Sequence, residues 1–148
     1  EEQTMLVQQI LNSKGATGVI TVKPGTRVSE VAQMLAEARI GGVVVSKNGK
    51  SVDGILSERD IVRSLALRGG DCLNETVDDM MTRNPSCCSP RATADDVLQR
   101  MTDGRFRHMP VTENDELVGI VTIGDVVKAR LQELAMERDA LEGMVMGH

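Results

Sequence analysis

Aromatic residues are almost absent from this sequence of 148 residues. Phe106 is the only one, and the chain has no tryptophan and no tyrosine. The hydrophobic core must therefore be built from Val, Ile, Leu, Met and Ala side chains. For the same reason, any pocket that receives a planar ring must have mainly aliphatic walls.

An excess of basic residues is also missing. The chain has 17 Lys and Arg against 22 Asp and Glu, which gives a formal net charge of −5. Proteins that bind nucleic acids non-specifically carry a basic excess, because the neutralisation of phosphates drives their affinity. The composition therefore predicts that no nucleic acid is a partner.

Long apolar runs and a cysteine framework are absent as well. Nowhere do about 18 uncharged apolar residues follow one another, and Glu1 and Glu2 do not begin a signal peptide. We therefore expect no membrane partner and no secretion. The three cysteines, Cys72, Cys87 and Cys88, are an odd number without regular spacing, which is typical of a reducing compartment. We predict a cytoplasmic protein.

Residues that enzymes and metal sites need are scarce. His108 and His148 are the only histidines and there is no Cys-x-x-Cys pair, so a tetrahedral zinc site lacks its ligands. The sequence has no Gly-x-x-x-x-Gly-Lys loop, no Gly-x-Gly-x-x-Gly loop and no recognisable pair of nucleophile and base. We predict no metal site, no catalytic cofactor and no enzyme activity.

What the sequence does contain is an internal repeat. Residues 54–62 (GILSERDIV) match residues 119–127 (GIVTIGDVV), and further upstream Pro24 matches Pro90. After each proline, apolar residues at i, i+3, i+4 and i+7 form one stripe of an amphipathic helix. These stripes are Val28, Val31, Ala32 and Leu35 in the first copy, and Ala94, Val97, Leu98 and Met101 in the second.

Each copy also contains strand-like segments and a second helix. The Asn48-Gly49 pair supplies the turn of a hairpin, and the second helix starts at Ser57 or Thr122. Because a lone three-stranded copy covers little of its own sheet, we predict an α+β fold in which two βαββα repeats pack as one pseudo-symmetric module. The expected strands are residues 19–22, 42–46 and 52–56, and then 86–89, 108–112 and 117–121.

With these features the chain resembles a pair of CBS domains. The resemblance depends on the motif Gly-hydrophobic-x-Ser/Thr-x-x-Asp, which recurs in register with the strand, proline and hairpin landmarks. Short helical lead-ins precede the copies at residues 7–11 and 77–82. The resemblance divides the chain into CBS domain 1 with its lead-in (residues 1–75), CBS domain 2 (76–131), and a C-terminal helical extension and tail (132–148).

Many members of this family bind an adenosine-containing ligand in two clefts between their sheets. The resemblance implies a regulatory sensor that binds AMP, or ATP or NAD, and that modulates an unknown partner protein as a homodimer. An S-adenosylmethionine binder and a ligand-free interaction or dimerisation module are the alternatives. The resemblance assigns adenine to Thr21, Val22, Cys87, Cys88 and the backbone around Val43, Met109 and Pro110. It assigns ribose and phosphate to Ser57, Arg59, Asp60, Arg107, His108, Thr122 and Asp125.

The spacing within the motif suits a nucleoside. Ser57 and Asp60 share one helix face, so a hydroxyl and a carboxylate can point at the same ligand, and the carboxylate can accept from two ribose hydroxyls. We expect the strand to bring Gly54 close to the ligand and the helix N-terminus to favour an anion. Ser-x-x-Asp is also a capping signature. An aspartate fully engaged in a cap cannot bind ribose as well.

The only dense cationic cluster lies at residues 105–108 (RFRH). It either binds phosphate or forms a solvated helix end, and Arg59 is a second phosphate candidate. The first copy has Gly41-Gly42 where the second has Arg107-His108, so we expect unequal occupancy of the two clefts. We expect Asp125 to matter more than Asp60, because Asp125 lies in the copy that carries the cluster.

The last helix is predicted to run to Glu142. Its apolar residues follow alternating steps of four and three, interrupted by Arg138, over fewer than three heptads. This stripe packs either on its own module or against a second subunit, and the resemblance favours the subunit. The stripe consists of Val127, Leu131, Leu134 and Leu141.

Overall fold

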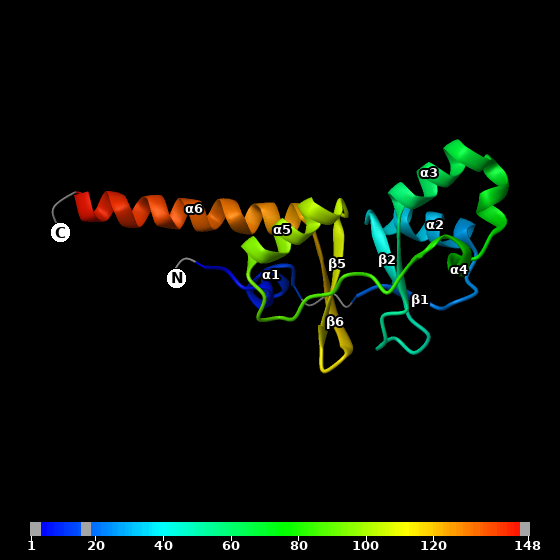
Figure 1. The fold of residues 1–148 in the computed structure, drawn as a ribbon, viewed down its shortest axis with the longest axis horizontal. Helices are drawn as coiled ribbons and strands as arrows, with labels where there is room; N and C mark the ends of the chain where they lie inside the picture. Colours follow the sequence, from blue (N-terminus) through cyan, green and yellow to red (C-terminus); the bar gives the residue numbers. More distant parts are fainter. Residues whose placement is uncertain (1–3, 16–18, 146–148) are drawn as a thin grey trace.

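The computed structural model describes residues 4–15 and 19–145. Two lobes stand side by side, each with one sheet, and the sheets face each other across the middle of the molecule (Figure 1). A long helix leaves one lobe and carries the C-terminus away from the body. The predicted α+β fold of two packed repeats is confirmed.

Lobe 1 is built on the first copy. Its sheet has the order β1-β2-β3-β4, in which β1 is parallel to β2 and the other pairs are antiparallel. The parallel pair requires a crossover, which α2 supplies. The elements are β1 (Thr21–Val22), α2 (Val28–Ala38), β2 (Gly42–Val45), β3 (Gly54–Ser57), α3 (Glu58–Arg68), the 3-10 helix η1 (Gly70–Asn74), α4 (Val77–Met80) and β4 (Thr82–Arg83).

Lobe 2 is built on the second copy. Strands β5 and β6 pair antiparallel, and Cys88 bridges to Val111 of β5 in parallel. The strand predicted at residues 86–89 is therefore reduced to one bridge, at the place where lobe 1 has the two residues of β1. The elements are α1 (Val7–Ser13), α5 (Ala94–Gly104), β5 (His108–Glu113), β6 (Glu116–Thr122) and α6 (Ile123–Val145).

The amphipathic stripes behave as their spacing predicts. Helix α2 buries Val28, Val31 and Leu35 in the core of lobe 1. Helix α5 buries the equivalent residues of the second copy, Ala94, Val97 and Met101, in the core of lobe 2. Both helices end at an arginine in the left-handed conformation, Arg39 on α2 and Arg105 on α5. Burial of these stripes against the sheets, at roughly 1.5–3 kcal/mol for a fully buried aliphatic side chain, is what holds each lobe together.

The two lead-in helices exchange lobes. Helix α1 precedes the first copy but packs in lobe 2, where Val7 and Ile10 join the core and the Val7 N–H donates to Ala92 O at 2.8 Å. Helix α4 precedes the second copy but packs in lobe 1, where Val77 joins the core and its N–H donates to Thr26 O at 2.8 Å. Each lobe therefore depends on both halves of the chain, and the two copies must fold together.

The glycine that opens each motif makes room for a lead-in side chain. A β-carbon built on Gly54 would lie 2.5 Å from Met81 Sδ, and one built on Gly119 would lie 2.7 Å from Leu11 Cδ2. Gly54 lines neither cleft, and Met81 fills the space that a side chain would take at this position.

Helix α6 is longer than predicted and only its first half packs on the module. Val126, Ala129 and Glu133 are buried. The Glu133 carboxylate accepts from the Met5 backbone N–H and pairs with Arg130, which ties α6 to the N-terminal segment. The predicted stripe faces the other way, since Leu131 and Leu134 are 62% and 51% exposed. Within residues 4–15 and 19–145, no helix is both long and apolar enough to cross a membrane.

Candidate functional site

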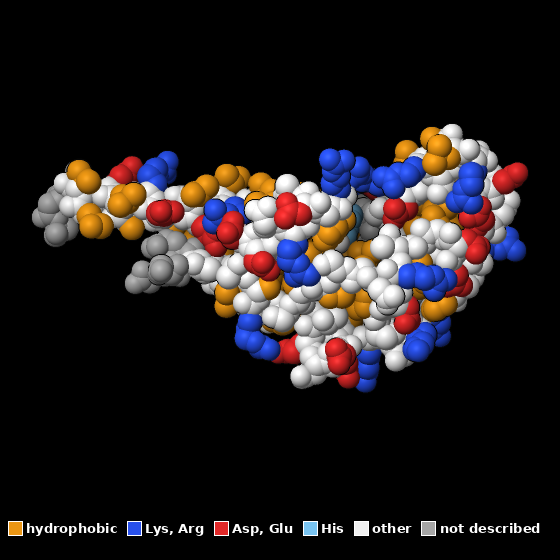
Figure 2. Space-filling view, viewed as in Figure 1, with side chains coloured by type: hydrophobic (Ala, Val, Ile, Leu, Met, Phe, Trp, Pro, Cys, Tyr) orange, Lys and Arg blue, Asp and Glu red, His pale blue; other side chains and the backbone are white. Residues whose placement is uncertain are grey.

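Two clefts lie between the lobes, and each is lined by both copies. Cleft 1 has a volume of about 270 Å³. Its floor includes His108, and basic side chains stand over the hollow on the face shown in Figure 2. One wall comes from lobe 1, with Ile55, Ser57, Arg59, Asp60, Arg63 and Thr82, and the other from the linker and lobe 2, with Pro85, Ser86, Gly104, Arg105, Phe106, Arg107 and His108.

Cleft 2 is the pseudo-symmetric counterpart and has a volume of about 520 Å³. Here the second motif contributes Gly119, Ile120 and Thr122, and lobe 1 contributes the loop between α2 and β2. Lys14, at the end of α1, also reaches this cleft. The remaining lining residues are Leu11, Gly15, Val19, Ile20, Ala38, Arg39, Ile40, Gly41, Gly42, His108 and Val118.

His108 forms a wall common to both clefts. A β-carbon on Gly41 would lie 3.1 Å from its Nε2, and one on Gly42 would lie 3.2 Å from its Cδ2. The two glycines therefore leave the space that the imidazole fills. Burial lowers the pKa of His108 below its usual range, and the carboxylate of Glu58 only partly opposes this effect. The ring is neutral at physiological pH.

Asp60 caps α3 with one of its two carboxylate oxygens. Oδ2 accepts from the Ser57 backbone N–H at 2.9 Å and from the Ser57 hydroxyl at 3.0 Å, while the Asp60 N–H donates to Ser57 Oγ at 3.3 Å. The hydroxyl proton of Ser57 is therefore used by the cap. Among the described residues, nothing donates a hydrogen bond to Asp60 Oδ1. Asp60 Oδ1 therefore remains available as an acceptor in cleft 1.

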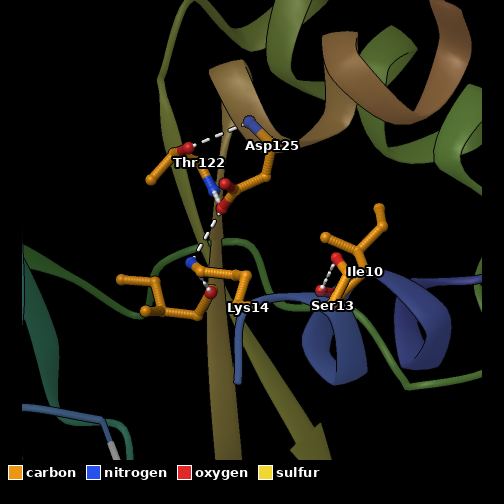
Figure 3. A network of polar contacts seen from close by, with 6 residues as sticks. Ile10, Ser13, Lys14, Thr122 and Asp125 are labelled. Carbon is orange, nitrogen blue, oxygen red and sulfur yellow. Dashed lines mark hydrogen bonds and ion pairs between the residues drawn. The ribbon is translucent and has the colours of Figure 1, made fainter. Parts of the chain in front are cut away.

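Asp125 has the same capping role but a further partner. It accepts from the Thr122 backbone N–H at 2.9 Å and from Lys14 Nζ at 2.8 Å, and Nζ also donates to Ile120 O at 3.0 Å (Figure 3). Burial alone would raise the pKa of Asp125, but the hydrogen bonds from Lys14 and Thr122 outweigh it and hold the pKa below its usual range. Lys14 and the cap both use Oδ2, so a lysine neutralises the carboxylate that the motif offers to cleft 2.

The charges of the two clefts differ. Cleft 1 is lined by four arginines, at positions 59, 63, 105 and 107, and by one aspartate. All four arginines are exposed, and within the described part of the chain none of them forms an ion pair. Cleft 2 has only Lys14 and Arg39, and the lysine is already paired. Cleft 1 is therefore the more cationic of the two clefts.

A profile of the CBS domain matches residues 13–67 and again residues 77–132, which are the two copies of the repeat. The chain belongs to the CBS domain family. Two CBS domains with two clefts at their junction account for the pseudo-symmetry described above.

Solved CBS-domain structures and curated relatives agree with this assignment. The chain is 44% identical to the CBS-domain containing protein ATU1752 from Agrobacterium tumefaciens, with a TM-score of 0.80 over 85% of this chain and 99% of that one. The CBS domain protein PAE2072 from Pyrobaculum aerophilum, solved with AMP, is 25% identical, with a TM-score of 0.70 over 82% of this chain and 89% of that one.

Among curated proteins, the mitochondrial CBS domain-containing protein CBSX3 of Arabidopsis thaliana is 28% identical over 98% of this chain and 74% of its own length. The chain spans only 23% of the length of a larger Arabidopsis relative, CBSCBSPB2. The CBS pair therefore occurs both in short proteins and within much longer ones.

The structure brings half of the predicted CBS site residues to a cleft. Ser57, Arg59, Asp60 and Arg107 line cleft 1, Thr122 lines cleft 2, and His108 lines both. Asp125 adjoins cleft 2 through Lys14. The residues expected around adenine line neither cleft, since Val22, Val43, Cys88, Met109 and Pro110 are buried, and Thr21 and Cys87 are half-buried beside them.

The residues that line the clefts lie about two positions before the strand residues that were expected to contact adenine. Where adenine was expected at Thr21 and Val22, cleft 2 is lined by Val19 and Ile20, and where it was expected at Cys87 and Cys88, cleft 1 is lined by Pro85 and Ser86. These lining residues come just before β1 and before the Cys88 bridge, and the chain enters the core immediately after them. The reason for expecting Asp125 to matter more than Asp60 does not hold, because Arg107 shares its cleft with Asp60 rather than with Asp125.

The sequence reasoning missed Arg63, Lys14 and Arg39. Arg63 lies one helical turn after Arg59, so the i, i+4 spacing on α3 could have identified it. Lys14 and Arg39 had no comparable signal, because their cleft is assembled from α1 and a loop that are remote from the second motif in the sequence.

Proposed function

We propose that this CBS pair is a regulatory module that binds an adenine nucleotide in cleft 1, with AMP, ATP and NAD as the candidate ligands. One observation carries the proposal: among the described residues, an unused carboxylate oxygen, a helix N-terminus and four arginines without ion pairs share a single cleft. This combination matches a ribose joined to phosphate. PAE2072, which was solved with AMP, supports the choice of nucleotide.

The ribose would bind at Asp60. Because its Oδ2 is committed to the cap of α3, Oδ1 is the acceptor that the ribose hydroxyls can reach. Hydrogen bonds to a charged acceptor contribute about 1.5–3 kcal/mol each. Capping and ligand binding are compatible here, because the two functions use different oxygens.

The phosphate would bind between the arginines of the two walls. Arg59 stands at the first turn of α3, where the helix dipole favours an anion, and Arg107 stands on the opposite wall from lobe 2. A ligand in this position contacts both lobes. Binding would therefore favour one placement of the lobes over another, which is how a ligand biases a partner protein.

The proposed role is regulatory rather than catalytic. Burial raises the pKa of the Cys88 thiol to about 11 and also raises the pKa of Cys87, although Arg100 opposes it in both cases. These thiols stay protonated at neutral pH and are poor nucleophiles. A cytoplasmic location stays a prediction, since one relative is described as mitochondrial.

A role in subunit association is the second candidate, and α6 favours it. The stripe of Val127, Leu131, Leu134 and Leu141 is 41–62% exposed, and packing on the module is made by the opposite face. The stripe therefore supports the proposed homodimer. A chain that dimerised but bound no nucleotide would be an interaction module only.

Calorimetric titration of the full chain with AMP, ATP, NAD and S-adenosylmethionine tests the proposal. We expect Kd in the micromolar range for at least one adenine nucleotide, about −8 kcal/mol, and a matching rise in melting temperature, because the ligand binds only the folded form. Absence of heat and of thermal shift with all four ligands would refute nucleotide binding. Binding of S-adenosylmethionine alone would reassign the ligand.

A further inference from the structure

We propose that cleft 1 selects adenosine ligands that carry at least two linked phosphates. This inference rests on the proposed function and adds the chemistry of the ligand. Its basis is the charge and arrangement of the cleft. Four arginines and Asp60 leave a net of three positive charges at the cleft. One phosphate monoester brings only about 1.5 to 2 negative charges at neutral pH.

The arginines form two pairs on facing walls. Arg59 and Arg63 lie on one face of α3, about 6 Å apart along the helix axis at 1.5 Å per residue. Arg105 and Arg107 lie between α5 and β5 on the wall of lobe 2. A phosphate near the N-terminus of α3 would lie closest to Arg59, and Arg63 lies one turn further along the helix. A second linked phosphate would engage Arg63.

Arg105 is held in a conformation that favours glycine. Its φ of 58° is left-handed, and its N–H donates to Met101 O at the end of α5. Glycine is the usual residue at such helix ends, because a side chain is strained there. Arginine at this position therefore costs stability that glycine would not, and it adds a guanidinium to cleft 1. Arg39, with φ of 56° at the end of α2, is the same feature in cleft 2.

Titrations of the full chain in magnesium-free buffer with adenosine, AMP, ADP, ATP and NAD test this inference. We expect ADP and ATP to bind at least about tenfold more tightly than AMP, since each added phosphate gains charge-assisted bonds. Tighter binding of NAD than of AMP would show that a bridging diphosphate suffices. Tighter binding of ADP and ATP alone would show that a terminal phosphate is required, and both results support the proposal.

Matched variants separate the arginines from folding. Arg105→Gly should keep or raise the melting temperature and weaken ADP by about 10-fold or more, and Arg39→Gly should have the same thermal effect without weakening ADP. Arg63→Ala should weaken ADP and leave adenosine unchanged. AMP binding as tightly as ADP and ATP to the parent would overturn the inference while leaving nucleotide binding intact. Failure of every ligand, adenosine included, would instead remove the proposed function.

We also infer, from a separate observation, that Lys14 closes cleft 2 to ribose. Its ammonium group donates both to the Asp125 carboxylate and to Ile120 O, and both acceptors belong to the second motif. A ribose at this aspartate would have to share the carboxylate with the ammonium group, which lies 2.8 Å from Oδ2 and neutralises its charge. The cleft 1 counterpart, Asp60, forms no ion pair within the described residues.

Binding stoichiometry tests the role of Lys14. Equilibrium dialysis with saturating ADP should give one nucleotide per chain for the parent and for Lys128→Met, a control lysine on α6 that forms no ion pair among the described residues. Lys14→Met should give two. Two nucleotides bound to the parent, or one bound to Lys14→Met, would each overturn this second inference.

Discussion

Asp60→Asn separates a ribose ligand from a helix cap, because the side chain keeps its shape and loses its charge. The asparagine carbonyl can still accept from the Ser57 N–H, which Asp60 Oδ2 accepts at 2.9 Å. The amide nitrogen then stands where Oδ1 stood and cannot accept from a ribose hydroxyl. The loss of one charged acceptor, about 1.5–3 kcal/mol, should weaken nucleotide binding by roughly 10- to 100-fold. Folding should lose only about 0.3–1 kcal/mol, the usual effect of an acidic group near a helix N-terminus.

Asp125→Asn is the matched control in the other cleft. It removes the ion pair with Lys14, which is partly exposed and contributes about 0–1 kcal/mol to stability. Because Asp125 lies at the cleft that we expect to be unoccupied, the nucleotide affinity should stay within about twofold of that of the parent. Calorimetry gives the affinities and thermal melting gives the stabilities. If Asp60→Asn binds nucleotide like the parent while melting several degrees lower, Asp60 is a cap only and the ribose assignment is wrong.

Three further predictions concern stability and assembly. Burial lowers the pKa of His108 below its unfolded value of about 6.5, so below pH 6.5 the unfolded chain binds more protons than the folded chain. The free energy of unfolding therefore falls as the pH drops through this range. His108→Gln should flatten the fall in melting temperature between about pH 7 and pH 5.5. Gly54→Ala should destabilise by about 1–3 kcal/mol in chemical denaturation, since its methyl group meets Met81, whereas Gly143→Ala, in open space on α6, should stabilise by up to about 1 kcal/mol; equal effects would contradict the packing role of the motif glycine. Leu134→Glu should convert a dimer to a monomer in light scattering, and an unchanged mass would show that the α6 stripe is not the contact.

The features that the sequence predicts well are those that local physics determines. The stripes on α2 and α5 follow from a period that any helix imposes, and the Ser57 and Asp60 pair forms its cap within a single turn. The hairpin of β5 and β6 pairs His108 with Thr122, close to the expected ends of the strands. Each of these depends on residues that are near one another in the chain.

The features that it predicts poorly depend on packing between remote segments. Nothing near α1 indicates that it packs on Ala92 rather than on the copy that follows it. The strand residues around the clefts were displaced by about two positions, because alternation along a strand identifies the two faces but not the point at which the strand leaves solvent. Val22 and Cys88 are buried for this reason, and their neighbours two residues earlier form the walls.

The difference between the two clefts follows from substitutions at equivalent points of the repeat. Arg39 and Arg105 end their helices in the same left-handed conformation, so the backbone has kept its symmetry while the surrounding charges have not. Three residues further along, Gly42 of lobe 1 is the equivalent of His108 of lobe 2. The glycine leaves the space between the two clefts that the imidazole fills, and only one side chain fits there. Arg105 and Arg107 of lobe 2 lie with Arg59 and Arg63 of lobe 1 in cleft 1, so the cationic side chains gather there. Lys14, delivered by the exchanged helix α1, then neutralises Asp125 in the other cleft. A symmetric fold thus produces one cationic cleft and one whose aspartate is paired with a lysine, and a single ligand bound in cleft 1 would act on the lobes asymmetrically.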